Sequence, residues 1–267
     1  MQLPRITKKQ KEIVALIYKF RYLNRVQIQK ILKHKDARRI NAWARDLVNK
    51  GYLGRIFINK IPLNTIPAKY YLGKLGIKYL RKLKDEQQVN NTYLKRLHHE
   101  AEKSDYFKAH HLLIADIYIK LAQSCLGNQS TFVFATQSRL VSDEITSSFK
   151  PHIYIMIADK YGKAKRYFIE LVGENMPRFA IRARIRAYLD FYLDGTWKDH
   201  FRYAHPHILF IVPKTRKIDR FVYRYTKRIL EEEEIDDKKL KIYTADLDKV
   251  TRFGIDDELI RRQVETY

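Results

Sequence analysis

The sequence predicts an α+β protein of two domains, with short helices and a β-hairpin at the N-terminus followed by a longer mixed α/β domain. Over residues 7–49, apolar residues recur at helical spacing, and from Tyr52 the pattern changes to strand-like alternation. In the second part of the chain, apolar strand-like runs are separated by helical segments, which is typical of a sheet covered by helices. At 267 residues, the chain is long enough for two separate cores.

Three helices are expected near the N-terminus, over residues 7–20, 24–32 and 36–49. Thr7 and Asn24 each stand just before an apolar periodic stretch, and both side chains are good N-caps. The third helix is expected to bury Ile40, Trp43, Leu47 and Val48 and to stop at Gly51, because glycine accepts the left-handed conformation that often ends a helix.

A hairpin is expected to follow these helices. Its strands are predicted at residues 52–58 and 69–72, with a proline-bearing loop at 59–67 between them and a closing helix at 76–83. Three helices followed by such a hairpin are the element order of a winged helix-turn-helix. We therefore expect a winged-helix domain over residues 1–84, a polar linker over 85–100 and a second domain over 101–267.

The second domain is expected to alternate helices and strands. Helices are predicted at 110–121, 176–193 and 218–233, strands at 131–135, 153–157, 166–172, 208–212 and 241–244, and a last helical turn or two in the tail. The run Ile208–Val212 is continuously apolar and is closed by Pro213, which suits a strand covered on both faces.

The charge of the chain is strongly positive, with 53 Lys and Arg against 30 Asp and Glu and a net charge of +23. Such an excess favours binding to a polyanion, and a solvated basic surface is the alternative. No apolar run approaches the ~18 residues of a membrane span, and the N-terminus lacks the apolar core of a signal peptide. The single cysteine, Cys125, excludes an internal disulfide and a thiolate metal site. We expect a cytoplasmic protein without membrane contact.

The third helix carries the predicted DNA-reading surface. Arg38, Asn41 and Arg45 recur at spacings of three and four, so they project from one side of the helix. Arginine can bind guanine bidentately and asparagine can bind adenine. A solvated basic helix is the alternative. Further DNA contacts are expected from Lys35, Arg39, Arg55, Lys60 and Lys69, of which the last three belong to or flank the hairpin and would meet phosphates.

A second basic surface is predicted on the helix at 176–193. Arg178, Arg182 and Arg186 follow one another at intervals of four residues, so three guanidinium groups share one face. Contact with phosphates and simple solvation are the two interpretations of this face.

Several segments in matching order resemble the replication-relaxation family of plasmid and integrative-element proteins. They are TKKQKEIVALIYKFRYLNRVQIQKIL, ARRINAWARDLVNKGYLGR, AKYYLGKLGIKYL, HHLLIADIYIKL, KPHIYIMI, YFIELVGEN, RARIRAYLDFY, HPHILFIVP and KIYTADLDKV. The resemblance implies an N-terminal winged helix and a second domain with a restriction-endonuclease-like, PD-(D/E)XK-type fold. It also implies a role in replication, DNA relaxation or mobilisation, including conjugation.

The resemblance also indicates where a nuclease site would stand. This chain has His152 after Pro151, where family members carry an aspartate, and valine at 172, where a lysine or aspartate would follow Glu170. A lone carboxylate beside a histidine is a poor Mg²⁺ site. We therefore expect no catalysis, metal or cofactor, with Glu170 paired to a basic neighbour such as Arg184. The remaining alternative is a rearranged site built from Asp116, Glu144 and Glu170 beside His152.

The sequence thus predicts a sequence-specific duplex-DNA-binding accessory of a plasmid or mobile element, acting in replication, mobilisation or control of those genes. Its expected partners are double-stranded DNA and replication or relaxase proteins of the same element. Two alternatives stay open, a divergent metal-dependent nuclease targeted by the winged helix and a repressor of transcription that acts as a homodimer.

Overall fold

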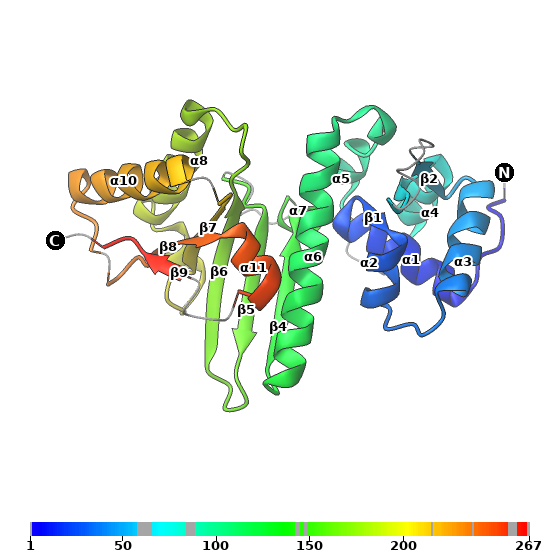
Figure 1. Cartoon of the computed structure of the whole chain (residues 1–267), viewed down its shortest axis with the longest axis horizontal. Helices are drawn as coiled ribbons and strands as arrows, with labels where there is room; N and C mark the ends of the chain where they lie inside the picture. Colours follow the sequence, from blue (N-terminus) through cyan, green and yellow to red (C-terminus); the bar gives the residue numbers. More distant parts are fainter. Residues whose placement is uncertain are drawn as a thin grey trace. The chain divides into compact units, whose positions relative to one another are not determined.

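The structure, a computed structural model, describes residues 2–57, 66–83, 89–141, 145–146, 149–214, 216–236, 238–255 and 261–265 (Figure 1). The chain forms two compact units, Met1–Ile119 and Lys120–Tyr267, and the division falls within helix α6 (Asp105–Gly127). Both units combine helices with a sheet, which confirms the predicted α+β class. None of the described helices combines the length and apolar content that crossing a bilayer would require.

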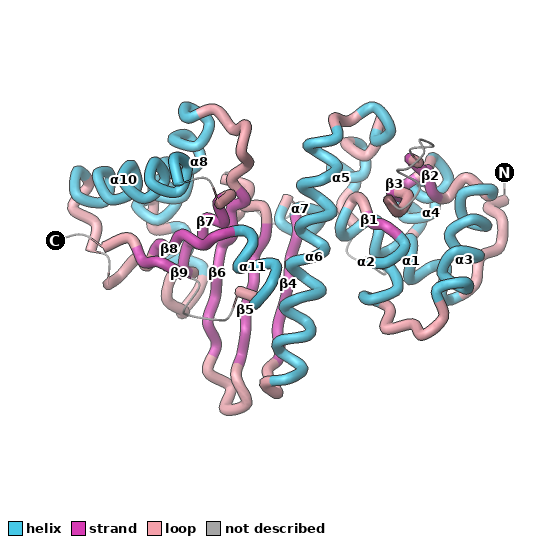
Figure 2. Tube along the Cα trace, in the orientation of Figure 1, coloured by secondary structure: helices cyan, strands magenta, loops and turns pink. Residues whose placement is uncertain are grey.

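Unit 1 combines short helices with a three-stranded sheet of order β1-β3-β2 (Figure 2). Its elements before α6 are α1 (Lys8–Phe20), β1 (Leu23–Asn24), α2 (Arg25–Ile31), α3 (Ala37–Asn49), β2 (Leu53–Ile56), β3 (Lys69–Leu72), α4 (Lys74–Lys82), α5 (Asn91–Lys95) and the 3₁₀ turn η2 (Glu100–Glu102). The three helices and two strands expected from the sequence are all present. The two-residue strand β1 was not predicted, because it is too short to show a period and exists only through its antiparallel pairing with β3.

The helix starts follow from local side-chain chemistry. Thr7 Oγ1 accepts a hydrogen bond from the backbone of Gln10, while the Gln10 side chain accepts one from the backbone of Thr7. Asn24 caps α2 in the same reciprocal way with Gln27. These capping boxes satisfy backbone donors that a helix leaves unpaired, which confirms both predicted starts. At the end of α3, Gly51 has a φ of 73°, the left-handed conformation that its sequence position predicts.

The described part of segment 85–100 packs into unit 1. Val89, Tyr93, Leu94 and Leu97 are buried there, and Asn90 caps α5 because its Oδ1 accepts a hydrogen bond from the backbone N–H of Tyr93.

A buried ion pair joins the end of α1 to η2. The Arg21 guanidinium donates two hydrogen bonds of 2.7 Å to the Glu100 carboxylate, and the Tyr22 hydroxyl donates to the Glu100 carbonyl. The two side chains of the pair are both nearly inaccessible to water. Segment 89–100 is therefore part of the packing of the first unit.

Unit 2 is built on a six-stranded mixed sheet of order β4-β5-β6-β7-β8-β9. Its elements after α6 are β4 (Thr131–Thr136), α7 (Gln137–Leu140), β5 (Ile153–Ala158), β6 (Ala164–Leu171), α8 (Arg178–Leu193), α9 (Thr196–His200), β7 (His207–Val212), α10 (Arg216–Glu232), β8 (Ile242–Asp246), α11 (Leu247–Phe253) and β9 (Arg261–Gln263). Strands β4, β5 and β6 are antiparallel, β6, β7 and β8 are parallel, and β9 returns antiparallel to β8. The short elements α7, α9 and β9 were not predicted.

Helices α8 and α10 cover the same face of this sheet. Each connects two adjacent parallel strands, β6 to β7 and β7 to β8, and both steps go in the same direction across the sheet. Two right-handed crossovers of this kind place both helices on one face. Ile208, Phe210 and Val212 of β7 accordingly pack into one core cluster with residues of both helices. Glu170 on β6 points to this face as well, where it meets α8.

A buried histidine lies in the aromatic part of this core. The His205 ring contacts Phe168, Phe191, Tyr192 and Trp197, and its Nδ1–H donates to the carbonyl of Pro206 at 2.7 Å. Its buried Nε2 has no hydrogen-bond partner among the described residues. Burial lowers the pKa of His205 from 6.5 to about 4, so the folded protein holds this ring neutral.

We therefore expect acidification to destabilise unit 2. Between pH 6.5 and 4, the unfolded chain protonates His205 while the folded chain does not, so stability is lost as the pH falls through this range, by at most ~3 kcal/mol. In a Trp43→Phe background, urea unfolding followed by Trp197 fluorescence should show this loss, and His205→Phe should reduce it. The same substitution at His200, an exposed histidine of this unit, is the control. An equal acid-induced loss in the His205→Phe protein would contradict the assignment.

Candidate nucleic-acid interface

Helix α3 presents a polar stripe to solvent. Arg38 and Arg45 are exposed and Asn41 is partly exposed, so the predicted stripe faces outward. On the opposite side Ile40 and Leu47 are buried as expected. The prediction was wrong for Trp43 and Val48, which are only partly buried. The core position between them is Ala44, which is fully buried, because a small side chain lets α3 approach its neighbours closely.

A groove of about 360 Å³ lies between α3 and the β2–β3 hairpin. Asn41, Arg45 and Asn49 line it from α3, and Arg55 lines it from β2. Its apolar lining includes Val48, Pro67 and two exposed side chains, Phe57 and Ile66. The groove therefore combines cations and an amide with apolar surface, the mixture that contacts with phosphates, base edges and sugar or methyl groups require.

Arg25 is a groove residue that the sequence prediction did not include. It is the first residue of α2 and lines the groove together with Arg45 and Arg55. Its position follows from the cap, because Asn24 fixes the start of α2 and thereby the direction of the next side chain. The cap signal was visible in the sequence, whereas the packing of α2 beside the hairpin was not.

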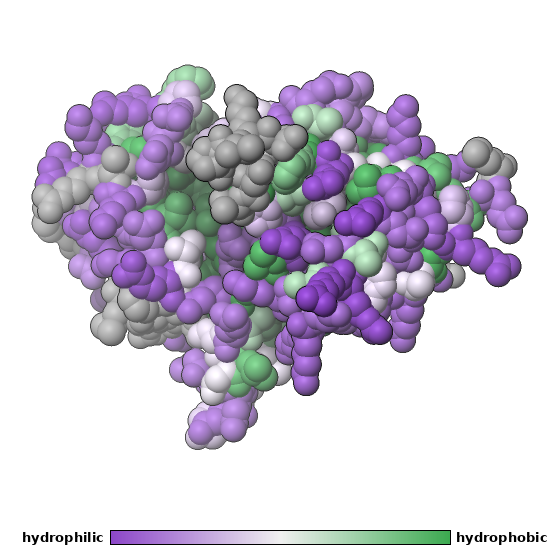
Figure 3. All heavy atoms as spheres, turned by 45° about the vertical axis from the view of Figure 1, so that its right-hand side comes forward, coloured by the Kyte–Doolittle hydropathy of each residue, from purple (hydrophilic) through white to green (hydrophobic). Residues whose placement is uncertain are grey.

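The cations of this face are not neutralised by any described carboxylate. Among the described residues, no carboxylate forms an ion pair with Arg25, Arg38, Arg39, Arg45 or Arg55. The Arg55 guanidinium instead lies over the Phe57 ring, 4.8 Å from its centroid. Figure 3, in which the right-hand side of Figure 1 comes forward, shows strongly hydrophilic side chains over most of the visible surface of unit 1. Uncompensated guanidinium groups of this kind create a positive potential, which favours the approach of anions.

The other predicted contacts of unit 1 have different surroundings. Lys35 is exposed in the turn before α3. Lys69 is largely covered and its Nζ lies 3.6 Å from Asp105 Oδ1, so its charge is already paired and it is not one of the uncompensated cations. The cause is the start of α6, which brings a carboxylate against β3. Lys60 lies outside the described residues.

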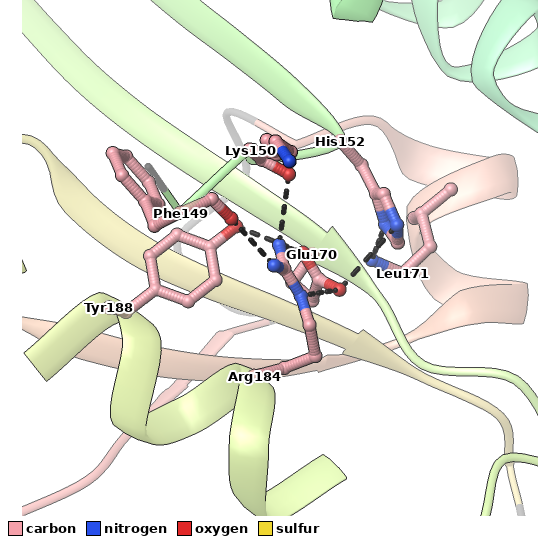
Figure 4. Close-up of polar contacts among 7 residues, drawn as sticks. All are labelled: Phe149, Lys150, His152, Glu170, Leu171, Arg184 and Tyr188. Atoms are coloured by element: carbon pink, nitrogen blue, oxygen red, sulfur yellow. Dashed lines mark hydrogen bonds and ion pairs between the residues drawn. The ribbon is translucent and has the colours of Figure 1, made fainter. Parts of the chain in front are cut away.

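Glu170 is the centre of a buried polar cluster in unit 2 (Figure 4). Arg184 Nε and Nη2 donate to the two Glu170 carboxylate oxygens at 2.8 and 2.7 Å, and the Tyr188 hydroxyl donates to one of them at 3.0 Å. Arg184 also donates to the carbonyls of Phe149 and Lys150. The predicted pairing of Glu170 with Arg184 is confirmed, and the pair ties the segment before β5, strand β6 and helix α8 together.

His152 completes the cluster. Its Nδ1 accepts a hydrogen bond from the backbone N–H of Leu171 at 3.1 Å, so the neutral ring carries its proton on Nε2, which lies 3.5 Å from Glu170 Oε1. Burial lowers the pKa of His152, and the Arg184 charge adds to this effect against the attraction of Glu170. Burial would raise the pKa of Glu170, but His152, Arg184 and Tyr188 outweigh burial and hold it below its ordinary value.

The cluster leaves little capacity for a metal ion. Three donated hydrogen bonds and the His152 ring surround the Glu170 carboxylate, whose side chain is fully buried. Asp116 lies on the part of α6 that belongs to unit 1, where its carboxylate accepts a hydrogen bond from Gln27. Glu144 lies outside the described residues. Within the described part of the chain, no group of three or more His, Cys, Asp or Glu side chains could hold a metal ion.

The three arginines predicted to share a face of α8 differ in their surroundings. Arg178 and Arg182 are exposed and line a second groove, between α8 and α10. Arg186 does not line that groove; its Nε donates to the Tyr225 hydroxyl at 3.3 Å, and its Nη1 lies 4.0 Å from Glu233. Arg178 and Arg182 therefore lie in the groove, whereas Arg186 lies outside it and contacts Tyr225 and Glu233.

Comparisons with known proteins return no family model, no curated protein and no solved structure that matches this chain. The resemblance to the replication-relaxation family therefore stays a prediction from the sequence segments.

Proposed function

We propose that unit 1 is a winged helix that binds duplex DNA in a sequence-dependent manner, with α3 as the recognition helix and the β2–β3 hairpin as the wing. In helix-turn-helix proteins, the recognition helix enters the major groove and its outward side chains meet the base edges. The observation that carries the proposal is the groove beside α3, which Asn41, Arg45 and Arg55 line and where no described carboxylate pairs with the arginines.

The separate elements would have distinct tasks in such a complex. Arg38, Asn41 and Arg45 lie along one side of α3 and would read base edges, while Arg25 and Arg55 would hold phosphates beside the helix. Phe57 and Ile66 are exposed at the groove and would contact sugars or thymine methyl groups. Because arginine contributes both a bidentate fork and a fixed charge, binding should be specific and sensitive to salt.

We further propose that unit 2 is not a nuclease and that its Glu170 cluster stabilises the fold. The support is that Glu170 is saturated by Arg184, Tyr188 and His152 inside the core. Incubation of the full chain with supercoiled plasmid and Mg²⁺ or Mn²⁺ should therefore leave the plasmid intact. Cutting that a Glu170→Ala substitution abolishes would contradict this proposal, provided that the variant retains the circular dichroism spectrum of the parent.

A role as an accessory of a plasmid or mobile element, in replication, mobilisation or gene control, rests on the family resemblance alone. Footprinting of the full chain across a plasmid that carries its gene tests this role. Protection of an origin, a transfer nick site or a promoter would assign replication, mobilisation or control respectively, and uniform weak protection everywhere would contradict the proposed specificity.

A further inference from the structure

Helices α8 and α10 form a groove of about 450 Å³ that is lined almost entirely by cations. The cationic side chains are Arg178, Arg182, Lys217, Arg220, Arg224 and Arg228, and none of the described acidic side chains lines the groove. All six are exposed. Since α8 and α10 lie side by side on one face of the sheet, the fold itself brings their two rows of charge together.

The aromatic lining of the groove fixes the arginines. The rings of Phe221 and Tyr225 stack in parallel, with centroids 5.9 Å apart and an interplanar angle of 9°. The Arg178 and Arg182 guanidinium groups lie 5.3 and 5.6 Å from the centre of the Phe221 ring, and Arg182 and Arg228 lie 5.4 and 5.3 Å from that of Tyr225. Guanidinium groups held on aromatic faces keep their charge and lose less freedom when an anion binds.

Most of these cations have no counter-ion among the residues that the structure describes. Of the six, only Arg228 forms an ion pair with a described carboxylate, that of Glu232 at 3.1 Å. Arg178, Arg182, Lys217, Arg220 and Arg224 have none within the described part of the chain. The uncompensated charge is thus concentrated toward the N-terminal ends of both helices, while Glu231–Glu234 lie at the far end of α10.

The spacing of the charges fits a linear polyanion. Arg220, Arg224 and Arg228 follow one another at intervals of four residues, which puts their Cα atoms about 6 Å apart along the axis of α10. Arg178 and Arg182 repeat the same interval on α8. The guanidinium groups lie over Phe221 and Tyr225, and Tyr225 is buried, so the rings are poor platforms for unpaired bases. Such a groove suits a phosphodiester backbone whose bases are already stacked in a duplex.

We propose that the α8–α10 groove is a second DNA site, which binds the sugar-phosphate backbone of a duplex without regard to sequence. This site goes beyond the proposed recognition function of unit 1, because it lies in the other unit and depends on none of the residues of α3 or the β2–β3 hairpin. It assigns a binding role to Lys217, Arg220 and Arg224, which the sequence prediction did not include, and removes Arg186 from the predicted set.

The test compares two full-length variants of equal charge loss. Arg220→Gln with Arg224→Gln removes two groove cations, and Lys160→Gln with Lys163→Gln removes two exposed cations at the β5–β6 turn of the same unit. Affinity for a 30-base-pair duplex of arbitrary sequence is measured against salt concentration. Each lost phosphate contact should reduce the magnitude of the slope of the logarithm of the association constant against the logarithm of the salt concentration by about 0.9. The slope of the groove variant should therefore be about 1.8 smaller in magnitude, and the variant should bind roughly thirtyfold more weakly near 0.15 M salt.

The same comparison is then repeated in a chain that also carries Arg45→Ala and Arg55→Ala. The groove effect should persist there, because the two sites are independent. The proposed groove site would be overturned if the groove variant had the same slope as the parent, or if the turn variant showed an equal reduction in the magnitude of the slope. Neither result would bear on the proposed recognition face of unit 1. Tenfold tighter binding to a single strand of the same sequence than to the duplex would also overturn the proposal. So would binding to phosphatidylglycerol vesicles that requires Arg220 and Arg224, if binding to the duplex does not require them.

Discussion

Replacement of Arg45 and Arg55 together by alanine is expected to weaken binding of the full chain to its preferred duplex at least about thirtyfold. Arg45 lies on α3 and Arg55 on β2, and both line the groove beside the recognition helix. Each lost arginine contact should cost about 1–3 kcal/mol, so two together cost at least ~2 kcal/mol. Fluorescence anisotropy with a labelled duplex, recovered by selection from random sequences, measures the change.

The matched control for this prediction is Lys78→Ala with Lys82→Ala. Both lysines are exposed on α4 in the same unit, and neither lines the groove, so this variant removes the same charge without removing the proposed contacts. It should bind the selected duplex nearly as well as the parent. Equal weakening of both variants would mean that net charge, rather than the groove beside α3, determines the affinity.

Replacement of Arg184 by methionine is expected to lower the free energy of unfolding of unit 2 by ~3–5 kcal/mol. The substitution leaves the Glu170 carboxylate buried without its main counter-charge and removes the hydrogen bonds to the carbonyls of Phe149 and Lys150. Breaking one partner of a buried pair carries a cost of this size. Urea unfolding followed by Trp197 fluorescence, in a Trp43→Phe background, measures it.

Two further variants separate the role of the pair from simple loss of packing. Glu170→Gln combined with Arg184→Met removes both charges and should be more stable than Arg184→Met alone. Tyr188→Phe removes only one hydrogen bond to Glu170 and should cost ~1–2 kcal/mol. If Arg184→Met were as stable as the parent, the Glu170 cluster would not be the structural anchor proposed above.

Local signals in the sequence predicted much of the fold. The helix caps at Thr7 and Asn24 and the left-handed conformation of Gly51 were predicted correctly. Each depends on residues that are close in the sequence, so the rest of the fold was not needed to predict it. Strand β7 could also be predicted from its continuous apolar run, because a central strand needs apolar side chains on both faces. The pairing of Glu170 with Arg184 was predictable because the expected strand and the following helix had to pack together.

Features that depend on distant partners were not predictable. The strand β1 exists because β3 pairs with it, and the burial of Glu100 depends on Arg21, which lies 79 residues away in the chain. Segment 89–100 is polar by composition and was therefore predicted as a linker, although its four buried apolar residues, Val89, Tyr93, Leu94 and Leu97, recur at helical spacing.

In the candidate sites, too, local features could be predicted from the sequence and features that depend on distant residues could not. The row on α8 was visible from its spacing, whereas the pairing of that row with Arg220 and Arg224 across a groove depends on the order of the parallel strands. The paired state of Lys69 likewise required the position of Asp105 at the start of α6.

The central claim, that α3 reads duplex DNA, is tested most directly by selection from a pool of random-sequence duplexes at about 0.15 M salt. The full chain should enrich a common sequence motif, and a chain carrying Arg38→Ala, Asn41→Ala and Arg45→Ala should fail to enrich it while retaining weak binding to any duplex. Enrichment of the same motif by the triple variant, or of no motif by the parent chain, would contradict the claim.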